Sequence, residues 1–132
     1  MNNIPNEISI FPLSNAVFFP NTILPLNIFE PRYKKMVEDA LASDKMIGMI
    51  QVKNNNNSKK PEVFSVGCLG KIDTHTTTAD GRYLINLKGL VRFRILDESE
   101  TDLPYRKFRV TYDEFLDDLE KIKFNEKIDI LQ

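Results

Sequence analysis

The sequence is poor in the residues that build metal centres, disulfides and membrane spans. Its 132 residues include one cysteine and one histidine, Cys68 and His75. A lone cysteine cannot form an intramolecular disulfide, and a metal site would need several such ligands. No apolar run approaches the ~18 residues of a membrane-spanning helix, and the N-terminus has no secretory signal. These absences favour a cytoplasmic protein without a metal or other cofactor and without a membrane partner.

The net charge is small, and catalytic motifs are lacking. The 18 basic and 19 acidic residues leave a net charge of −1, which argues against electrostatic binding of nucleic acid by the chain as a whole. Gly67 to Lys71 faintly resembles a phosphate loop, but the spacing is wrong and Ile72 replaces the Ser or Thr. Because no catalytic constellation is present, we expect a non-enzymatic protein. Its 42% hydrophobic content suits one domain with one core.

A proline-broken apolar stretch, FFPNTILPLNIFEPRY at residues 18–33, precedes the clearest helical pattern. Its prolines bias the chain towards extended conformations, so the stretch cannot be one continuous helix. We expect an extended arm laid over a core. Pro31 suits the first turn of a helix, and the apolar spacing from Tyr33 onward predicts a helix to about Ala42. If Phe29 is buried, its truncation to Ala should cost ~3 kcal/mol or more.

Alternating apolar and polar residues predict several strands in the rest of the chain. Asp80-Gly81 between two such runs predicts a β-hairpin with a type I′ turn, and Gly89 should break or bulge the return strand. An acidic loop is expected after Leu96. The predicted strands cover about 8–12, 46–52, 66–75, 83–95 and 108–112.

The arm and the hairpin together resemble the N-terminal, substrate-recognition domain of ATP-dependent Lon proteases. The motifs that carry this resemblance are FP…PLNIFEPRY, VGCLGKID (66–73) and DGRYLINLKGLVRFRIL (80–96). The resemblance implies an α+β fold, a PUA-like β-pseudobarrel of about six mostly antiparallel strands with one packed helix, over residues 5–112. It also matches stand-alone members of the family, because no residue here resembles the ATPase or protease active sites.

Residues 113–132 read as the start of a helical C-terminal segment that is expected to be truncated. Asp113 suits a helix cap, and an apolar helical face is expected from Phe115, Leu116, Leu119 and Ile122. Seven acids and three lysines make this tail acidic, so it could lie against a basic strand face.

The resemblance implies a recognition domain that binds unfolded or degradation-tagged polypeptides, alone or for a partner protease. The candidate peptide-binding residues lie on the arm, where an exposed apolar strip would hold apolar segments. The arm prolines would also leave backbone groups free for an extended peptide. The alternative for these side chains is that they only cover the core. The four candidates are Phe18, Phe19, Pro20 and Leu24.

Two further functions stay open from the sequence. A basic strand face would suit an RNA-binding PUA-like module, with affinity falling steeply with salt, although the net charge makes nucleic acid the less favoured partner. A structural or homo-oligomerising domain is the third possibility. The RNA-binding candidates are Arg92, Arg94, Arg106 and Arg109.

Overall fold

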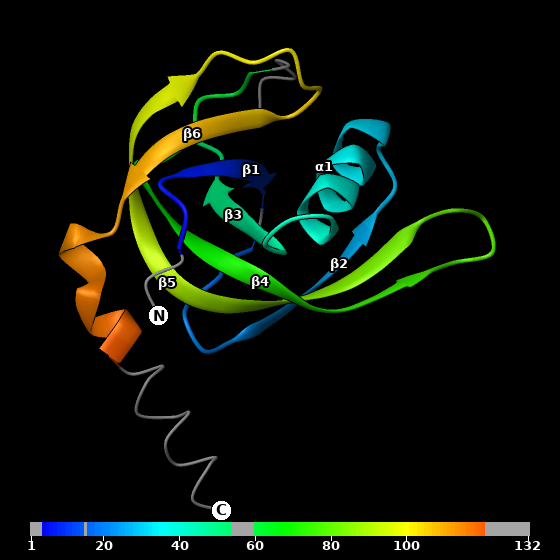
Figure 1. The fold of residues 1–132 in the computed structure, drawn as a ribbon, viewed down its shortest axis with the longest axis horizontal. Helices are drawn as coiled ribbons and strands as arrows, with labels where there is room; N and C mark the ends of the chain where they lie inside the picture. The colour runs from blue at the N-terminus through cyan, green and yellow to red at the C-terminus, as the bar shows by residue number, and fades with distance from the viewer. Residues whose placement is uncertain (1–3, 15, 54–59, 121–132) are drawn as a thin grey trace, which may run out of the picture.

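The structure is a computed structural model that describes residues 4–14, 16–53 and 60–120. Over these ranges the chain forms six strands and helix α1 (Figure 1). None of the helices in them is long and apolar enough to cross a membrane. The elements are β1 (Glu7–Leu13), β2 (Ile23–Ile28), α1 (Pro31–Leu41), β3 (Met46–Gln51), β4 (Val66–Thr77), β5 (Tyr83–Ser99), β6 (Arg106–Thr111) and the 3-10 turn η1 (Asp113–Phe115).

The strands form one sheet that closes on itself through the long strand β5. Their order is β2-β5-β4-β3-β1-β6, and β6 pairs back with β5. The two ends of β5 have different neighbours, because Tyr83 to Lys88 pair with β2 and Arg94 to Ser99 pair with β6. Only the β1–β3 pair is parallel among the described strands. The expected α+β fold of about six mostly antiparallel strands is confirmed.

A β-bulge lets strand β5 contribute to two separate cores. Leu69 pairs with Val91 but Gly70 pairs with Gly89, so Leu90 is the extra residue. Side chains before the bulge, Ile85 and Leu87, join the cluster under α1. Side chains after it, Val91 and Phe93, join the cluster inside the closed part of the sheet. The expected disturbance at Gly89 is therefore real, and it switches the buried face of the strand.

Helix α1 begins at Pro31, as its sequence predicts. The N–H groups of Tyr33 and Lys34 donate to the carbonyl of Glu30 (3.0 and 2.9 Å), and Pro31 has no N–H to leave unpaired. Figure 1 shows the helix lying over β2 and the adjoining hairpin. Its apolar face covers one core through Tyr33, Met36, Val37 and Ala40, which are all buried.

The condition on which a large cost of truncating Phe29 depended, its burial, is not met. The Phe29 side chain is 65% exposed, whereas Ile28 is 2% exposed. The strand alternation of β2 explains this, because it turns Leu24, Leu26 and Ile28 towards the core and leaves the next residue outside. Phe29 is therefore not a core residue.

The hairpin is where the sequence places it, but its turn is not type I′. A type I′ turn needs two residues with positive φ, and only Gly81 has one here (88°). The Gly81 N–H donates to the Thr78 carbonyl (3.1 Å), and the Thr78 N–H donates to the Arg82 carbonyl (2.9 Å). This is a three-residue loop closed by a left-handed glycine.

The C-terminal segment differs from the expected helix cap at Asp113 and from the expected apolar helical face. Asp113 lies inside the 3-10 turn η1, which has no side-chain cap, and residues 116–120 are helical. Phe115 and Leu119 pack on the core, but Leu116 is 54% exposed. Residue 122 and the rest of the segment to 132 lie outside the described residues.

Candidate functional site

The arm reaches β2 through a tight turn from Phe19 to Thr22. Pro20 takes the second position of this turn and Asn21 the third, with a positive φ of 66°, which is the arrangement of a type II turn. The Thr22 hydroxyl donates to the Phe19 carbonyl (2.7 Å), and so does the Thr22 N–H (3.3 Å). The arm is thus locally rigid before β2 begins.

The same turn is fixed to β5 at Gly89. The Asn21 N–H donates to the Gly89 carbonyl (2.9 Å), and the Gly89 N–H donates to the Thr22 carbonyl (2.8 Å). A Cβ at position 89 would lie 2.1 Å from the Phe19 carbonyl oxygen. Only glycine allows the arm backbone this close to the strand.

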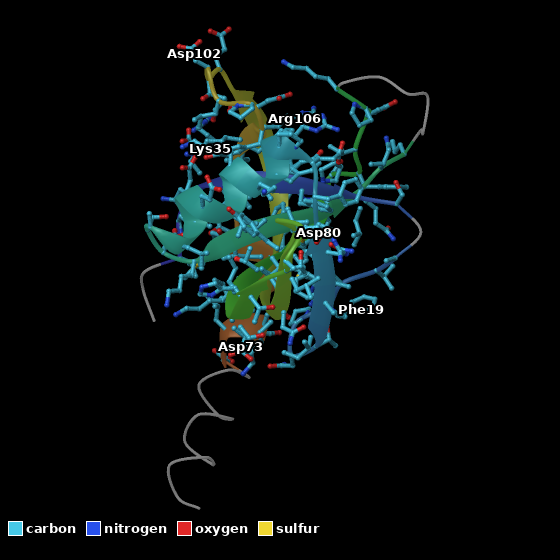
Figure 2. The ribbon with its side chains drawn as sticks, turned by 90° about the vertical axis from the view of Figure 1, so that its right-hand side faces the viewer. Phe19, Lys35, Asp73, Asp80, Asp102 and Arg106 are labelled. Carbon is cyan, nitrogen blue, oxygen red and sulfur yellow. The ribbon has the colours of Figure 1, made fainter. Side chains whose placement is uncertain are left out.

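The four predicted peptide-binding residues divide into covered and exposed side chains. Phe18 and Leu24 are half-buried against the core under α1, and a Cβ at Gly70 would lie 2.9 Å from the Phe18 ring. Phe19 is 54% exposed and projects from the body beside β2 (Figure 2). Pro20 is partly exposed within the turn. Phe18 and Leu24 therefore have the covering role that the sequence left open as an alternative.

Two exposed apolar residues that were not predicted extend the surface around Phe19. Val17 is 58% exposed and Ile23 is 51% exposed. The alternation that buries Leu24 already indicates an outward Ile23, but nothing comparable marks Val17. We call Val17, Phe19 and Ile23 the apolar strip.

A small pocket lies beside the apolar strip. Its volume is about 140 Å³, and Val17, Phe18 and Phe19 form one wall while Gly67 and Cys68 form another. Burial raises the pKa of the Cys68 thiol to about 12, so this group stays protonated near neutral pH and is a poor nucleophile. The Cys68 side of the pocket therefore supplies no reactive thiol.

Strand β2 is a free edge next to the apolar strip. It ends the strand order and pairs only with β5 among the described strands. The Gly89 N–H donates to the Thr22 carbonyl, and residues of an antiparallel strand alternate between bonding to the neighbouring strand and pointing away from it. The backbone groups of Ile23, Pro25 and Asn27 therefore point away from β5. Pro25 has no N–H, which is tolerated at an edge. Free edge groups of this kind can pair with an added extended chain.

The four arginines predicted for RNA binding already have carboxylate partners. The guanidinium of Arg106, for example, donates to Glu98 (2.9 Å) and holds the pKa of that carboxyl below its ordinary value. A phosphate would have to compete with these carboxylates, so the structure does not favour the RNA-binding alternative. The pairs are Arg92–Asp118, Arg94–Glu114, Arg106–Glu98 and Arg109–Asp97.

Two of these pairs place residues 113–120, the described part of the acidic tail, against β5, as the charge of the tail predicts. Asp118 is 3% exposed and accepts from the backbone N–H, Nε and Nη2 of Arg92, each at 3.0 Å. Arg92 also lies over the Phe115 ring, 4.8 Å from its centroid. Residues 113–120 thus supply the carboxylate partners of Arg92 and Arg94, while Arg106 and Arg109 are paired within the sheet.

A larger groove of about 1080 Å³ separates the start of α1 from the segment before β6. No sequence pattern predicted this groove. Phe11 and Tyr33 contact each other in its wall, with ring centroids 4.5 Å apart. The charged groups around it include the pairs Arg32–Glu30 and Arg106–Glu98. Because an apolar segment in the groove would desolvate these charged side chains, the groove is less suited to such a segment than the apolar strip.

Comparisons with known proteins agree with this fold. A family model, the substrate-binding domain of ATP-dependent protease La (LON), matches residues 7–131. A Lon protease of Dictyoglomus thermophilum is 31% identical over 109 residues, covering 82% of this chain and 14% of that protein. Lon protease 2 of Myxococcus xanthus is 29% identical over 110 residues, covering 82% of this chain and 13% of that protein. The chain thus spans a small part of these curated relatives.

Solved structures show the same fold at low identity. A Lon N-terminal domain protein from Xanthomonas campestris superposes with a TM-score of 0.67 at 24% identity, over 80% of this chain and 59% of that one. The N-terminal domain of a Lon protease from the Mycobacterium avium complex gives 0.64 at 15% identity, over 80% and 54%. With the family model matching most of its length, the chain belongs to the family of Lon substrate-binding domains.

Proposed function

We propose that this chain is a non-catalytic recognition domain that binds unfolded or degradation-tagged polypeptides through the apolar strip. Membership of the Lon substrate-binding family supplies the substrate-recognition role. The observation that carries the proposal is that three apolar side chains, Val17, Phe19 and Ile23, are more than half exposed around the turn from Phe19 to Thr22, which hydrogen bonds hold against β5. Exposed apolar side chains gathered beside a free strand edge are typical of a binding surface.

The size of the strip sets the expected affinity. Burying the exposed part of each side chain would contribute ~1–2 kcal/mol, and the free edge of β2 would add backbone hydrogen bonds of about 1 kcal/mol each. Ordering an unfolded segment opposes these gains. We therefore expect dissociation constants of roughly micromolar or weaker, as suits a domain that must release its substrate.

The test is fluorescence anisotropy of a labelled, permanently unfolded polypeptide titrated with the chain at two salt concentrations. The variant Phe19→Ser with Ile23→Ser should weaken binding about tenfold or more, since two of the three exposed contacts are lost. Phe18 is left intact because its side chain also covers the core.

A matched control uses two apolar residues of similar exposure away from the arm. Leu96 and Leu116 are each 54% exposed, so Leu96→Ser with Leu116→Ser removes similar exposed apolar surface. This control should bind like the parent protein. Equal weakening by both double variants would show that the strip is not the site, and circular dichroism would confirm that each variant is folded.

The same proposal assigns peptide-bond cleavage to a partner protease. The chain spans only 13–14% of the Lon proteases it resembles, and the surface described above contains no activated nucleophile. The purified chain should therefore leave an unfolded protein substrate intact over hours. Cleavage that persists after rigorous purification would contradict the non-catalytic assignment.

A further inference from the structure

Two lysines and an apolar-strip residue form one row across three strands. Lys71 on β4 lies directly opposite Lys88 on β5, and Lys88 lies directly opposite Ile23 on β2. Residues directly opposite on antiparallel strands share a face, with Cβ atoms about 5 Å apart. All three side chains are exposed. The apolar strip therefore continues into a pair of ammonium groups.

These two lysines differ from most lysines in the described part of the chain. Lys71 and Lys88 have no carboxylate or aromatic partner there, and like charges directly opposite on a sheet are destabilising. Their positive field is thus not compensated within the described fold, unlike that of the arginines. The other lysines with partners are Lys35, Lys53, Lys60 and Lys107, which are ion-paired, and Lys34, which lies over the Tyr83 ring.

The groove beside these two lysines is lined by uncharged residues. A groove of about 380 Å³ continues along β2, β5 and β4, and Leu84 in it is 41% exposed. The nearest carboxylate along β4 is Asp73, at the register shift between Ile72 and Thr74. Besides Leu84, the groove is lined by Pro25, Leu26, Asn27, Thr74, Thr76, Ile85 and Asn86.

We propose that this face selects polypeptide segments in which acidic residues flank apolar ones, an inference that rests on the proposed polypeptide binding. Ile23 and Leu84 would contact apolar side chains, while Lys71 and Lys88 attract neighbouring carboxylates. The free edge of β2 favours an extended polypeptide over RNA, because it offers backbone groups rather than further positive charge. Charge complementarity then gives a preference among substrates in addition to non-specific apolar binding.

The experiment compares labelled peptides that differ only in charge. A short unstructured peptide with aromatic and aliphatic residues is made with Glu, Gln or Lys at the same flanking positions. At low salt the Glu version should bind about two- to tenfold tighter than the Gln version, as expected for one or two exposed ion pairs, and the Lys version weakest. The preference should fade at high salt.

Charge variants test whether the two lysines cause the preference. Lys71→Gln with Lys88→Gln should abolish the difference between the Glu and Gln peptides while leaving the affinity for the Gln peptide unchanged. Lys35→Gln with Lys53→Gln removes the same net charge from other surfaces and should preserve the difference. Asp73→Asn should increase the difference in affinity between the Glu and Gln peptides.

The outcomes separate this inference from the proposed function. If the wild type binds the Glu and Gln peptides equally, or if the preference survives Lys71→Gln with Lys88→Gln, the inference fails while polypeptide binding stands. If no peptide binds the wild type, both fail. Displacement of the Glu peptide by single-stranded RNA at stoichiometric concentration would also overturn it, because the lysines would then serve phosphate.

Discussion

Replacing Gly89 by Ala should destabilise the protein strongly, although it adds a single methyl group. That methyl would lie 2.1 Å from the Phe19 carbonyl oxygen and 2.8 Å from its carbonyl carbon, so the arm backbone must move. Overpacking of this kind costs ~1–3 kcal/mol. Movement of the arm also weakens two backbone hydrogen bonds, with Asn21 and Thr22, at about 1 kcal/mol each. We expect a total loss of about 3 kcal/mol in urea unfolding.

Gly81→Ala provides the control for this prediction. A Cβ at Gly81 would meet only the Lys34 Nζ, at 3.7 Å, and the φ of +88° is the sole obstacle. Its expected cost is therefore the conformational one, about 1 kcal/mol. If Gly89→Ala cost less than Gly81→Ala, or under ~1 kcal/mol, the close approach of the arm would not anchor it and the rigid apolar strip would lose its basis.

Three further changes follow from exposure, burial and charge. Phe29→Ala should cost less than ~1 kcal/mol by urea unfolding, because the side chain is 65% exposed; a larger cost would mean that it packs. Asp118→Ala should cost about 1–3 kcal/mol, because the buried carboxylate accepts three hydrogen bonds from Arg92; a neutral result would show that this contact does not hold the tail. The hydrogen bond from Arg106 lowers the pKa of Glu98 below 4.5. This pair therefore stabilises the fold above about pH 4.5 and loses that effect as the pH falls through the lowered pKa. Glu98→Gln should make the urea midpoint depend less on pH over that acid range. An unchanged pH dependence would contradict this assignment to the Arg106–Glu98 pair.

Local patterns in the sequence predict the elements that depend on nearby residues. The start of α1 at Pro31 follows from the missing N–H of proline and the apolar spacing after it. The hydrophobic strand β3 is buried as predicted, with Ile47 and Ile50 nearly inaccessible. Both elements depend on neighbouring residues rather than on distant partners, so the sequence pattern alone predicts them.

Strand β5 shows how distant partners override a local pattern. The acidic residues after Leu96 predict a loop, yet the strand continues to Ser99. Asp97 lies opposite Arg109 on β6 and is ion-paired with it. The acids are therefore cross-strand partners of basic residues that follow about ten positions later. Composition alone cannot distinguish such a charged strand from a solvated loop.

The candidate site depends on the same kind of long-range information. Phe18 and Phe19 are adjacent and chemically identical, but Phe18 covers Gly70 while the Phe19 backbone rests on Gly89. Which ring faces solvent is thus decided by two glycines 50 or more residues away in the sequence. A search for apolar residues could find the arm, but it could not separate its core-facing side from its binding side.

The densest group of cations in the sequence is not the group that the fold leaves available. The arginines of β5 and β6 form the denser basic cluster, but each is neutralised by a carboxylate on β5 or on residues 113–120. Lys71 is isolated in the sequence and Lys88 lies four residues before Arg92, yet the register of β4 with β5 places them opposite each other beside Ile23. Substrate preference should therefore follow the lysine pair, and replacing the ion-paired arginines of β5 and β6 should change stability rather than selectivity.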